Sequence, residues 1–207
     1  DFLAHSVERN TFLHSSIMNI KHCILVFILF CGLPGCESRK IKNEIERLTN
    51  REIQIPTDLE TIHNGICQNS SSTTCECLIK LLVIYSSEDC TLCKISHLYS
   101  FESLFTLTDK ALFSPIIVFI PEQKDYNQLR SLLSNNPFKY PVYVDKFGKT
   151  ELMNPTLPKD SRFHFLLLDK YNKVVLIGDP TASDAMWSLF RKTLDNMLAN
   201  DGLYIPE

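Results

Sequence analysis

The sequence predicts one mixed α/β domain, a sheet with helices on both of its faces. Its composition, 44% hydrophobic and 22% charged residues, is typical of a globular chain. From residue 78 onward, apolar runs of strand length alternate with segments of helical periodicity. The chain then closes with a hairpin pattern and an amphipathic helix. Alternation followed by a terminal hairpin and helix is the pattern of a mixed sheet.

The charge balance and the cysteine count limit the function. The chain has 21 Lys and Arg against 24 Asp and Glu, for a net charge of -3. No basic run offers positive charge to phosphates, so we do not expect a nucleic-acid partner. Eight cysteines in 207 residues are many for a reducing cytosol, and their positions therefore matter.

The N-terminal segment has the pattern of a lipoprotein signal peptide. The apolar run 23–33 follows Lys21 and is shorter than the roughly 20 residues that a membrane span needs, but it suits a secretory h-region. It ends in Leu33-Pro34-Gly35-Cys36, which resembles the bacterial lipobox, whose Cys is acylated and becomes the mature N-terminus. A buried core helix is the alternative, but polar residues 37–40 follow the run at once.

This pattern predicts the processing and location of the chain. Met18 is the expected start, residues 1–17 a mis-called upstream extension and residues 18–35 the signal peptide. Cys36 would carry the lipid, and its several acyl chains would anchor the protein firmly to a membrane. We therefore expect a lipoprotein of the bacterial cell envelope that faces the periplasm.

Residues 36–77 are expected to form a tether, a short strand and a loop. Residues 37–50 are polar and have apolar side chains at helical spacing, which favours a short surface helix. Polar and apolar residues alternate over residues 52–55, and Pro56 follows, which indicates a short strand. The stretch 64–74 is rich in Asn, Ser and Thr and is predicted to be a loop.

Residues 78–199 are predicted to form the core domain, and residues 200–207 a tail. The first strand is near-continuously apolar, as in strands that are covered on both faces. The expected strands are 78–85, 116–120, 140–144, 163–169 and 173–178; the expected helices begin near residue 95, run from 126 to 133, and run from 181 to 198. Residues 146–161 are expected to be loop with about one helical turn, and Thr181 to cap the last helix.

Cys90-Thr-Leu-Cys93 lies between the first strand and the first helix of this domain. The element order with this CxxC resembles the thioredoxin fold. The hairpin segment 165–178 is similar to the Phe-Leu-Ile-Asp-Lys-x-Gly-Lys-Ile hairpin of membrane-anchored, extracytoplasmic thioredoxin-like proteins. The resemblance covers residues 78–199, and its specificity lies in the combination, since CxxC alone is common.

The resemblance implies thiol–disulfide exchange on extracytoplasmic proteins, without a cofactor. Cys90 would be the nucleophile at the helix N-terminus, and Cys93 would resolve the mixed disulfide. A helix N-terminus stabilises a thiolate, which agrees with these roles. The partners would be the thiols and disulfides of other proteins.

Two departures from the family pattern weaken the catalytic expectation. Active members usually have an aromatic residue before the first Cys, where this chain has Glu88-Asp89, and a carboxylate there disfavours a thiolate. The family's cis-proline would fall at Phe163, while the nearest proline is Pro158. Substrate pairing along that backbone edge would then differ.

The other candidate sites are less favoured. Cys67 could close a loop disulfide with Cys75 or Cys77, which we prefer over a redox relay to Cys90. Zinc bound by two cysteine pairs is conceivable, but a buried strand separates Cys75 and Cys77 from Cys90 and Cys93.

His97 is more simply a solvated side chain on a helix flank than a base. No nucleophile elbow and no Gly-rich phosphate loop occurs in the chain. Two functions therefore stay open: a thiol–disulfide oxidoreductase, or a non-catalytic binding or assembly module in which a Cys90–Cys93 disulfide is structural.

Overall fold

The computed structural model describes residues 35–69, 77–89 and 91–206. The chain divides into two compact units, Asp1–Glu44 and Ile45–Glu207. Helix α2, Gly35–Leu48, spans this boundary and confirms the expected surface helix. The predicted signal peptide lies outside the described residues except for Gly35. Within the described ranges, no helix is both long and apolar enough to cross a membrane.

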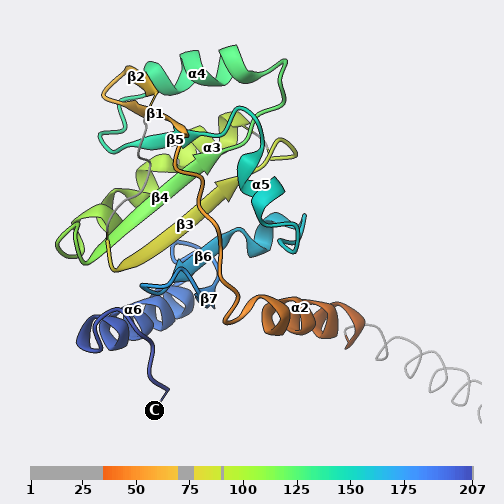
Figure 1. The fold of residues 1–207 in the computed structure, drawn as a ribbon, viewed down its shortest axis with the longest axis vertical. Helices are drawn as coiled ribbons and strands as arrows, with labels where there is room; N and C mark the ends of the chain where they lie inside the picture. The colour runs from red at the N-terminus through yellow and green to blue at the C-terminus, as the bar shows by residue number, and fades with distance from the viewer. Residues whose placement is uncertain (1–34, 70–76, 90, 207) are drawn as a thin grey trace, which may run out of the picture. The chain divides into compact units, whose positions relative to one another are not determined.

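The second unit is built on a mixed sheet, which Figure 1 shows with helices packed around it. In the described part of the chain the sheet has seven strands in the order β2-β1-β5-β4-β3-β6-β7. Strands β3, β4 and β5 are parallel, and the remaining pairs are antiparallel. The strands are β1 Glu60–His63, β2 Ile66–Asn69, β3 Ile79–Tyr85, β4 Phe113–Phe119, β5 Val142–Val144, β6 Phe165–Leu168 and β7 Val174–Ile177.

Strand β3 is the centre of this sheet. All seven of its residues are buried, as its continuous apolar sequence predicts. It pairs in parallel with β4 from Ile79↔Phe113 to Tyr85↔Phe119, and antiparallel with β6. Its one charged residue, Lys80, donates from Nζ to the carbonyl of Cys77 at 2.9 Å. Strand β3 is therefore held by pairing on both sides, and the turn at residues 86–89 follows directly from it.

The two faces of the sheet are covered differently. One face packs against the helical elements, through buried side chains such as Leu98, Leu129 and Phe190. These elements are α3 Thr91–His97, the 3-10 helix η1 Leu98–Thr106, α4 Tyr126–Ser134 and α6 Asp184–Ala199. The other face packs against Ile53 and Leu59 of an extended segment.

Two short helices complete the chain: α5 Lys149–Met153 and the 3-10 turn η2 Ser161–Phe163. Helix α5 ends beside the extended segment. There the Asn154 side chain makes two hydrogen bonds with the backbone of Gln54: its Oδ1 accepts from the Gln54 amide, and its Nδ2 donates to the Gln54 carbonyl. Helical elements thus pack around the sheet, and the fold class is the mixed α/β sheet that the sequence predicts. The terminal unit is the antiparallel β6–β7 hairpin followed by α6.

The N-terminal part of the sheet differs from expectation. The stretch 64–74 was predicted to be a loop, which is wrong for its first half: β1 and β2 form a hairpin around Asn64-Gly65. Both turn residues have positive φ, 50° and 76°, which is the preference of Asn-Gly hairpin turns. Strand β1 also pairs with β5 and so joins the core sheet. Residues 70–76 lie outside the described part.

Smaller differences have local causes. Residues 52–55 form one bridge, Glu52↔Lys173, because Gln54 bonds the Asn154 side chain instead of a strand. The helix after the CxxC turns into 3-10 helix at Leu98, a period that places Leu98, Phe101 and Leu104 on one buried side.

Helix α6 is capped by Ser183, whose Oγ accepts from the Met186 amide, and the predicted cap at Thr181 is wrong. The Thr181 hydroxyl donates to Asp179 instead, at 2.7 Å. A side chain bound to the preceding loop cannot also cap the helix.

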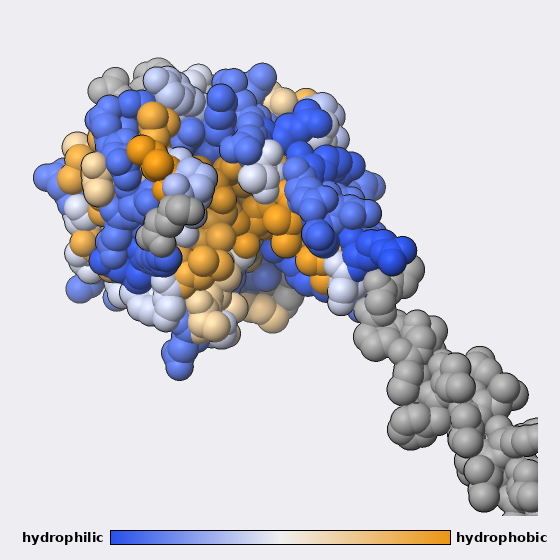
Figure 2. Space-filling model, turned by 90° about the horizontal axis from the view of Figure 1, so that it is seen from below, coloured by the Kyte–Doolittle hydropathy of each residue, from blue (hydrophilic) through white to orange (hydrophobic). Residues whose placement is uncertain are grey.

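Strand β7 is one edge of the sheet and leaves apolar side chains half-buried. Figure 2 shows an apolar band between hydrophilic areas on the side of the molecule that carries α6 and β7. Val175, Leu176 and Ile177 of β7 are only partly covered. The sheet's apolar surface therefore reaches solvent at this edge.

The turn of the β1–β2 hairpin offers a stability test. A Cβ at Gly65 would lie 2.9 Å from the Ser134 carbonyl oxygen, and φ is +76°. We expect Gly65→Ala to lower the free energy of unfolding by about 1–3 kcal/mol. Gly148→Ala is the matched control, because φ there is +64° but the nearest heavy atom is 4.0 Å away. Urea unfolding should show a clearly larger loss for Gly65→Ala; equal losses would contradict the steric argument.

Candidate functional site

The candidate site lies where β3 leads into α3. Residues 86–89 form a tight turn in which the Asp89 amide donates to the Ser86 carbonyl at 3.1 Å. Helix α3 begins at Thr91, directly after this turn. Cys93 is therefore in the first turn of the helix. Cys90 lies outside the described residues.

Cys93 is disulfide-bonded and exposed to solvent. It lines an open groove of about 530 Å³. Two positively charged residues line the same groove, Lys94 and Arg162, together with the ring of Phe165. Exposed disulfides are generally more reducible and more often chemically active than buried ones.

Asp89 does not act as an isolated charge. Its carboxylate accepts from the amide and the hydroxyl of Ser86, at 2.9 and 3.3 Å. Its second oxygen lies 3.6 Å from the Lys94 ammonium, and the Asp89 side chain is only 9% exposed. The Asp89 carboxylate, which the sequence predicts to disfavour a thiolate, is therefore hydrogen-bonded within its own turn, and its charge is partly neutralised by Lys94.

An apolar floor supports the groove. The Tyr85 ring packs against Phe119 at 4.9 Å and edge-on to Phe165 at 6.3 Å between ring centroids. Burial raises the pKa of the Tyr85 hydroxyl above its ordinary value, and the charges of Asp179 and Asp89 add to this effect. Tyr85 is therefore neutral at physiological pH and does not serve as a base.

His97 lies at one wall of the groove. Its Nε2 is 3.8 Å from an Asp179 carboxylate oxygen and 3.4 Å from the Thr181 hydroxyl. Its ring packs edge-on against Phe101 with centroids 5.4 Å apart, and 45% of the side chain is exposed. His97 is thus partly solvated, but the fold also gives it an acidic partner.

The segment before β6 departs from the cis-proline pattern, as its sequence predicts. The described residues contain no cis peptide bond, and Phe163 is buried within η2. The Phe163 amide donates to the Asp160 carbonyl and the His164 amide to the Ser161 carbonyl. Because both donors are used inside the turn, they are not available to pair with another extended chain.

The remaining cysteines form no site in the described ranges. Cys67 is a free thiol, 3.2 Å from the Ser134 hydroxyl, so the expected loop disulfide from Cys67 to Cys75 or Cys77 is not formed. Cys77 is buried just before β3, and Cys75 lies outside the described residues. Among the residues described, no three His, Cys, Asp or Glu side chains gather as metal ligands.

The sequence proposed Cys93 as a site residue but did not indicate most of the residues around it. Arg162, Phe165 and Asp179 come from η2, β6 and the loop before α6, and no motif connects them to the CxxC. The sequence places Phe165 in a strand, but strand pairing brings it opposite Val83 and next to the groove. No spacing along the chain could have indicated this.

No family model and no curated protein matches the chain. A thioredoxin-like protein from Porphyromonas gingivalis is 11% identical, with a TM-score of 0.43 over 73% of this chain and 95% of that one. A thioredoxin-like superfamily protein is 16% identical, with a TM-score of 0.46 over 77% and 99%.

AhpC from Enterococcus faecalis is 13% identical, with a TM-score of 0.44 over 77% of this chain and 99% of that one. Likenesses of this size carry no argument about activity. The strand order and pairing described above support the fold class independently of them.

Proposed function

We propose that this protein exchanges thiols and disulfides on extracytoplasmic proteins, with Cys90 as the nucleophile and Cys93 as its disulfide partner. The observation that carries the proposal is Cys93 itself: disulfide-bonded, exposed and in the first turn of α3. A disulfide retained only for stability has little reason to face solvent. The groove beside Cys93 offers room for a polypeptide segment.

The reaction needs no other cofactor. In the reducing direction, the Cys90 thiolate attacks one sulfur of a substrate disulfide and forms a mixed disulfide, and the other substrate sulfur leaves as a thiolate. The Cys93 thiolate then attacks the Cys90 sulfur, which closes the Cys90–Cys93 disulfide and releases the second substrate thiol. Two electrons pass from the protein to the substrate, and the reverse sequence oxidises a substrate dithiol.

The reduction potential of the Cys90–Cys93 pair tests this proposal. We expect a potential above about -300 mV in a glutathione redox titration, because structural disulfides lie below that value. The protein should also accelerate reduction of a small disulfide in the presence of excess dithiothreitol. A potential below this value, together with no acceleration, would sink the proposal.

A second function is favoured by a specific observation. The amides of Phe163 and His164 are bonded within η2 and cannot hold an extended substrate. A binding or assembly module with a structural Cys90–Cys93 disulfide would not need these donors. The same redox titration separates the two functions.

Lys94 provides a further test of the thiol environment. With Lys94→Gln, Asp89 loses its ammonium partner, so the uncompensated carboxylate should disfavour a nearby thiolate. We expect reduced Cys90 to be alkylated by iodoacetamide about two- to fivefold more slowly at neutral pH. Lys173→Gln, which removes the same charge from the β6–β7 turn, should leave the rate unchanged. Equal rates in both variants would show that Asp89 does not act on Cys90.

We also propose a lipid anchor at Cys36 and a location at the bacterial envelope, facing the periplasm. The support is the apolar run 23–33 followed by Leu33-Pro34-Gly35-Cys36. Cys36→Ala should abolish labelling by a radioactive fatty acid and release the protein from the membrane fraction. Unchanged labelling and fractionation of this variant would refute the anchor.

A further inference from the structure

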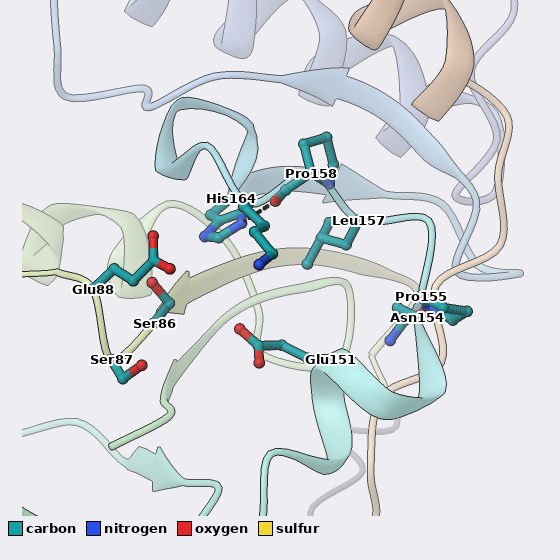
Figure 3. Close-up of a pocket in the computed structure, with 10 residues that line it drawn as sticks. Ser86, Ser87, Glu88, Glu151, Asn154, Pro155, Leu157, Pro158 and His164 are labelled. Atoms are coloured by element: carbon teal, nitrogen blue, oxygen red, sulfur yellow. Dashed lines mark hydrogen bonds between the residues drawn. The ribbon is translucent and has the colours of Figure 1, made fainter. Parts of the chain in front are cut away.

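A second pocket is lined by residues 86–88, which belong to the turn that precedes α3. Figure 3 shows it between this turn, the loop after α5, and His164, the residue before β6. Its volume is about 260 Å³. Its residues are separate from Cys93 and its groove, so it is a different cavity from the one proposed for exchange.

The ring of His164 gives this pocket an unused acceptor. His164 is 2% exposed, and its Nε2 lies 2.7 Å from the Pro158 carbonyl oxygen. A carbonyl only accepts, so Nε2 carries the proton, and the Nδ1 of the neutral ring is an acceptor. This Nδ1 is buried and has no hydrogen-bond partner among the described residues. Leaving such an atom unsatisfied costs about 1–3 kcal/mol, which favours an occupant that donates a hydrogen bond.

The charge of the pocket indicates what kind of donor fits. Glu88 and Glu151 enter from opposite sides, and Figure 3 shows both side chains next to the space in front of His164. Neither carboxylate has an ion-pair partner in the part of the chain that the structure describes. Lys159 is the one lysine or arginine in the lining, against two carboxylates, so negative charge is in excess. A cationic donor is therefore favoured over a neutral or anionic one.

The pocket walls suit the rest of such a ligand. Pro155, Leu157 and Pro158 supply apolar surface between the polar groups. An aliphatic stem could lie against them while its terminal nitrogen reaches the acceptors, the arrangement in which lysine side chains are commonly buried.

We propose that this pocket binds a primary ammonium group on an aliphatic chain, with His164 Nδ1, Glu88 and Glu151 accepting its hydrogen bonds. A lysine side chain of a peptide and a free diamine share this chemistry. Because Ser86 and Glu88 belong to the turn that leads into α3, a bound lysine would lie beside the CxxC segment. The binding itself does not depend on the proposed exchange activity.

Isothermal titration and NMR of the full chain test this proposal with three probes. These are the peptide acetyl-Gly-Lys-Gly-amide, the same peptide with norleucine in place of lysine, and 1,5-diaminopentane. We expect the lysine peptide to bind at least about tenfold more tightly than the norleucine peptide, since a charged hydrogen bond is lost in the latter. Tighter binding of the diamine than of the lysine peptide would identify a free amine as the ligand. The His164 Nδ1 resonance should shift on binding as it gains a donor.

Substitutions on the pocket rim keep the test independent of folding. Glu88 and Glu151 are exposed, so the double variant Glu88→Gln/Glu151→Gln should fold normally and bind the lysine peptide about tenfold more weakly. Glu52→Gln, an exposed carboxylate outside the pocket, is the matched control and should bind like the parent protein. Equal binding of the lysine and norleucine peptides, no effect of the double variant, or an Nδ1 resonance that already shows a bound proton would each overturn the proposal.

Discussion

Replacing Cys93 with Ser is expected to turn the protein into a trap for its partners. In Cys93→Ser the Cys90 thiolate can still attack a substrate disulfide, but no second thiol is present to resolve the product. Mixed disulfides should therefore accumulate and appear as high-mass bands on non-reducing gels of envelope extracts. These bands should disappear with dithiothreitol.

Cys90→Ser is expected to have the opposite result, because it removes the nucleophile. Exchange with a small disulfide should fall by at least about a thousandfold, toward the uncatalysed rate, and no mixed disulfides should form. Cys67→Ser is the matched control, since it removes a thiol on β2 without touching the CxxC. If Cys93→Ser accumulates no mixed disulfide and Cys90→Ser retains activity, the disulfide is structural, and the binding-module function replaces the enzyme.

Replacing Phe101 with Ala is expected to cause the largest loss of stability. Phe101 of η1 is 0% exposed, and its ring stacks on Phe165 of β6 with ring centroids 6.2 Å apart. Its side chain therefore fills the space between η1 and the sheet. Removing a buried Phe side chain leaves a cavity and costs about 3–5 kcal/mol of the free energy of unfolding. Equilibrium urea unfolding would measure this loss.

The control for Phe101→Ala is Leu152→Ala, an apolar truncation at a side chain that is 76% exposed. It should change the free energy of unfolding by no more than about 0.5 kcal/mol. A loss below about 1.5 kcal/mol for Phe101→Ala would mean that the structure relaxes into the cavity. The packing between η1 and Phe165 would then be less important than its burial indicates.

The core of the fold was predictable because its signals are local. Strand β3 is apolar at nearly every position, and helix α4 ends at Asn135-Asn136-Pro137 where its sequence stops favouring helix. The β6–β7 hairpin follows from two apolar runs around a short turn. Each of these features depends on residues that are neighbours in the sequence, so local sequence patterns predict it.

The β1–β2 hairpin was missed although its Asn-Gly turn is a recognised local signal. The strands on either side are short and carry polar residues, and the polar stretch that follows obscured them. What stabilises the hairpin is pairing between Ile62 and Val142 of β5, eighty residues farther along the chain. Long-range pairing of this kind cannot be read from local composition.

The candidate site divides in the same way. The Cys90-Thr-Leu-Cys93 motif and the presence of Phe163 in place of a proline are properties of short segments, and the sequence by itself determined them. The ion pair of Asp89 with Lys94, the contact of His97 with Asp179, and the unpaired His164 Nδ1 were decided by the tertiary structure. The physical reason is that charge neutralisation and burial depend on distances in space, and the fold alone sets those distances for residues from different elements.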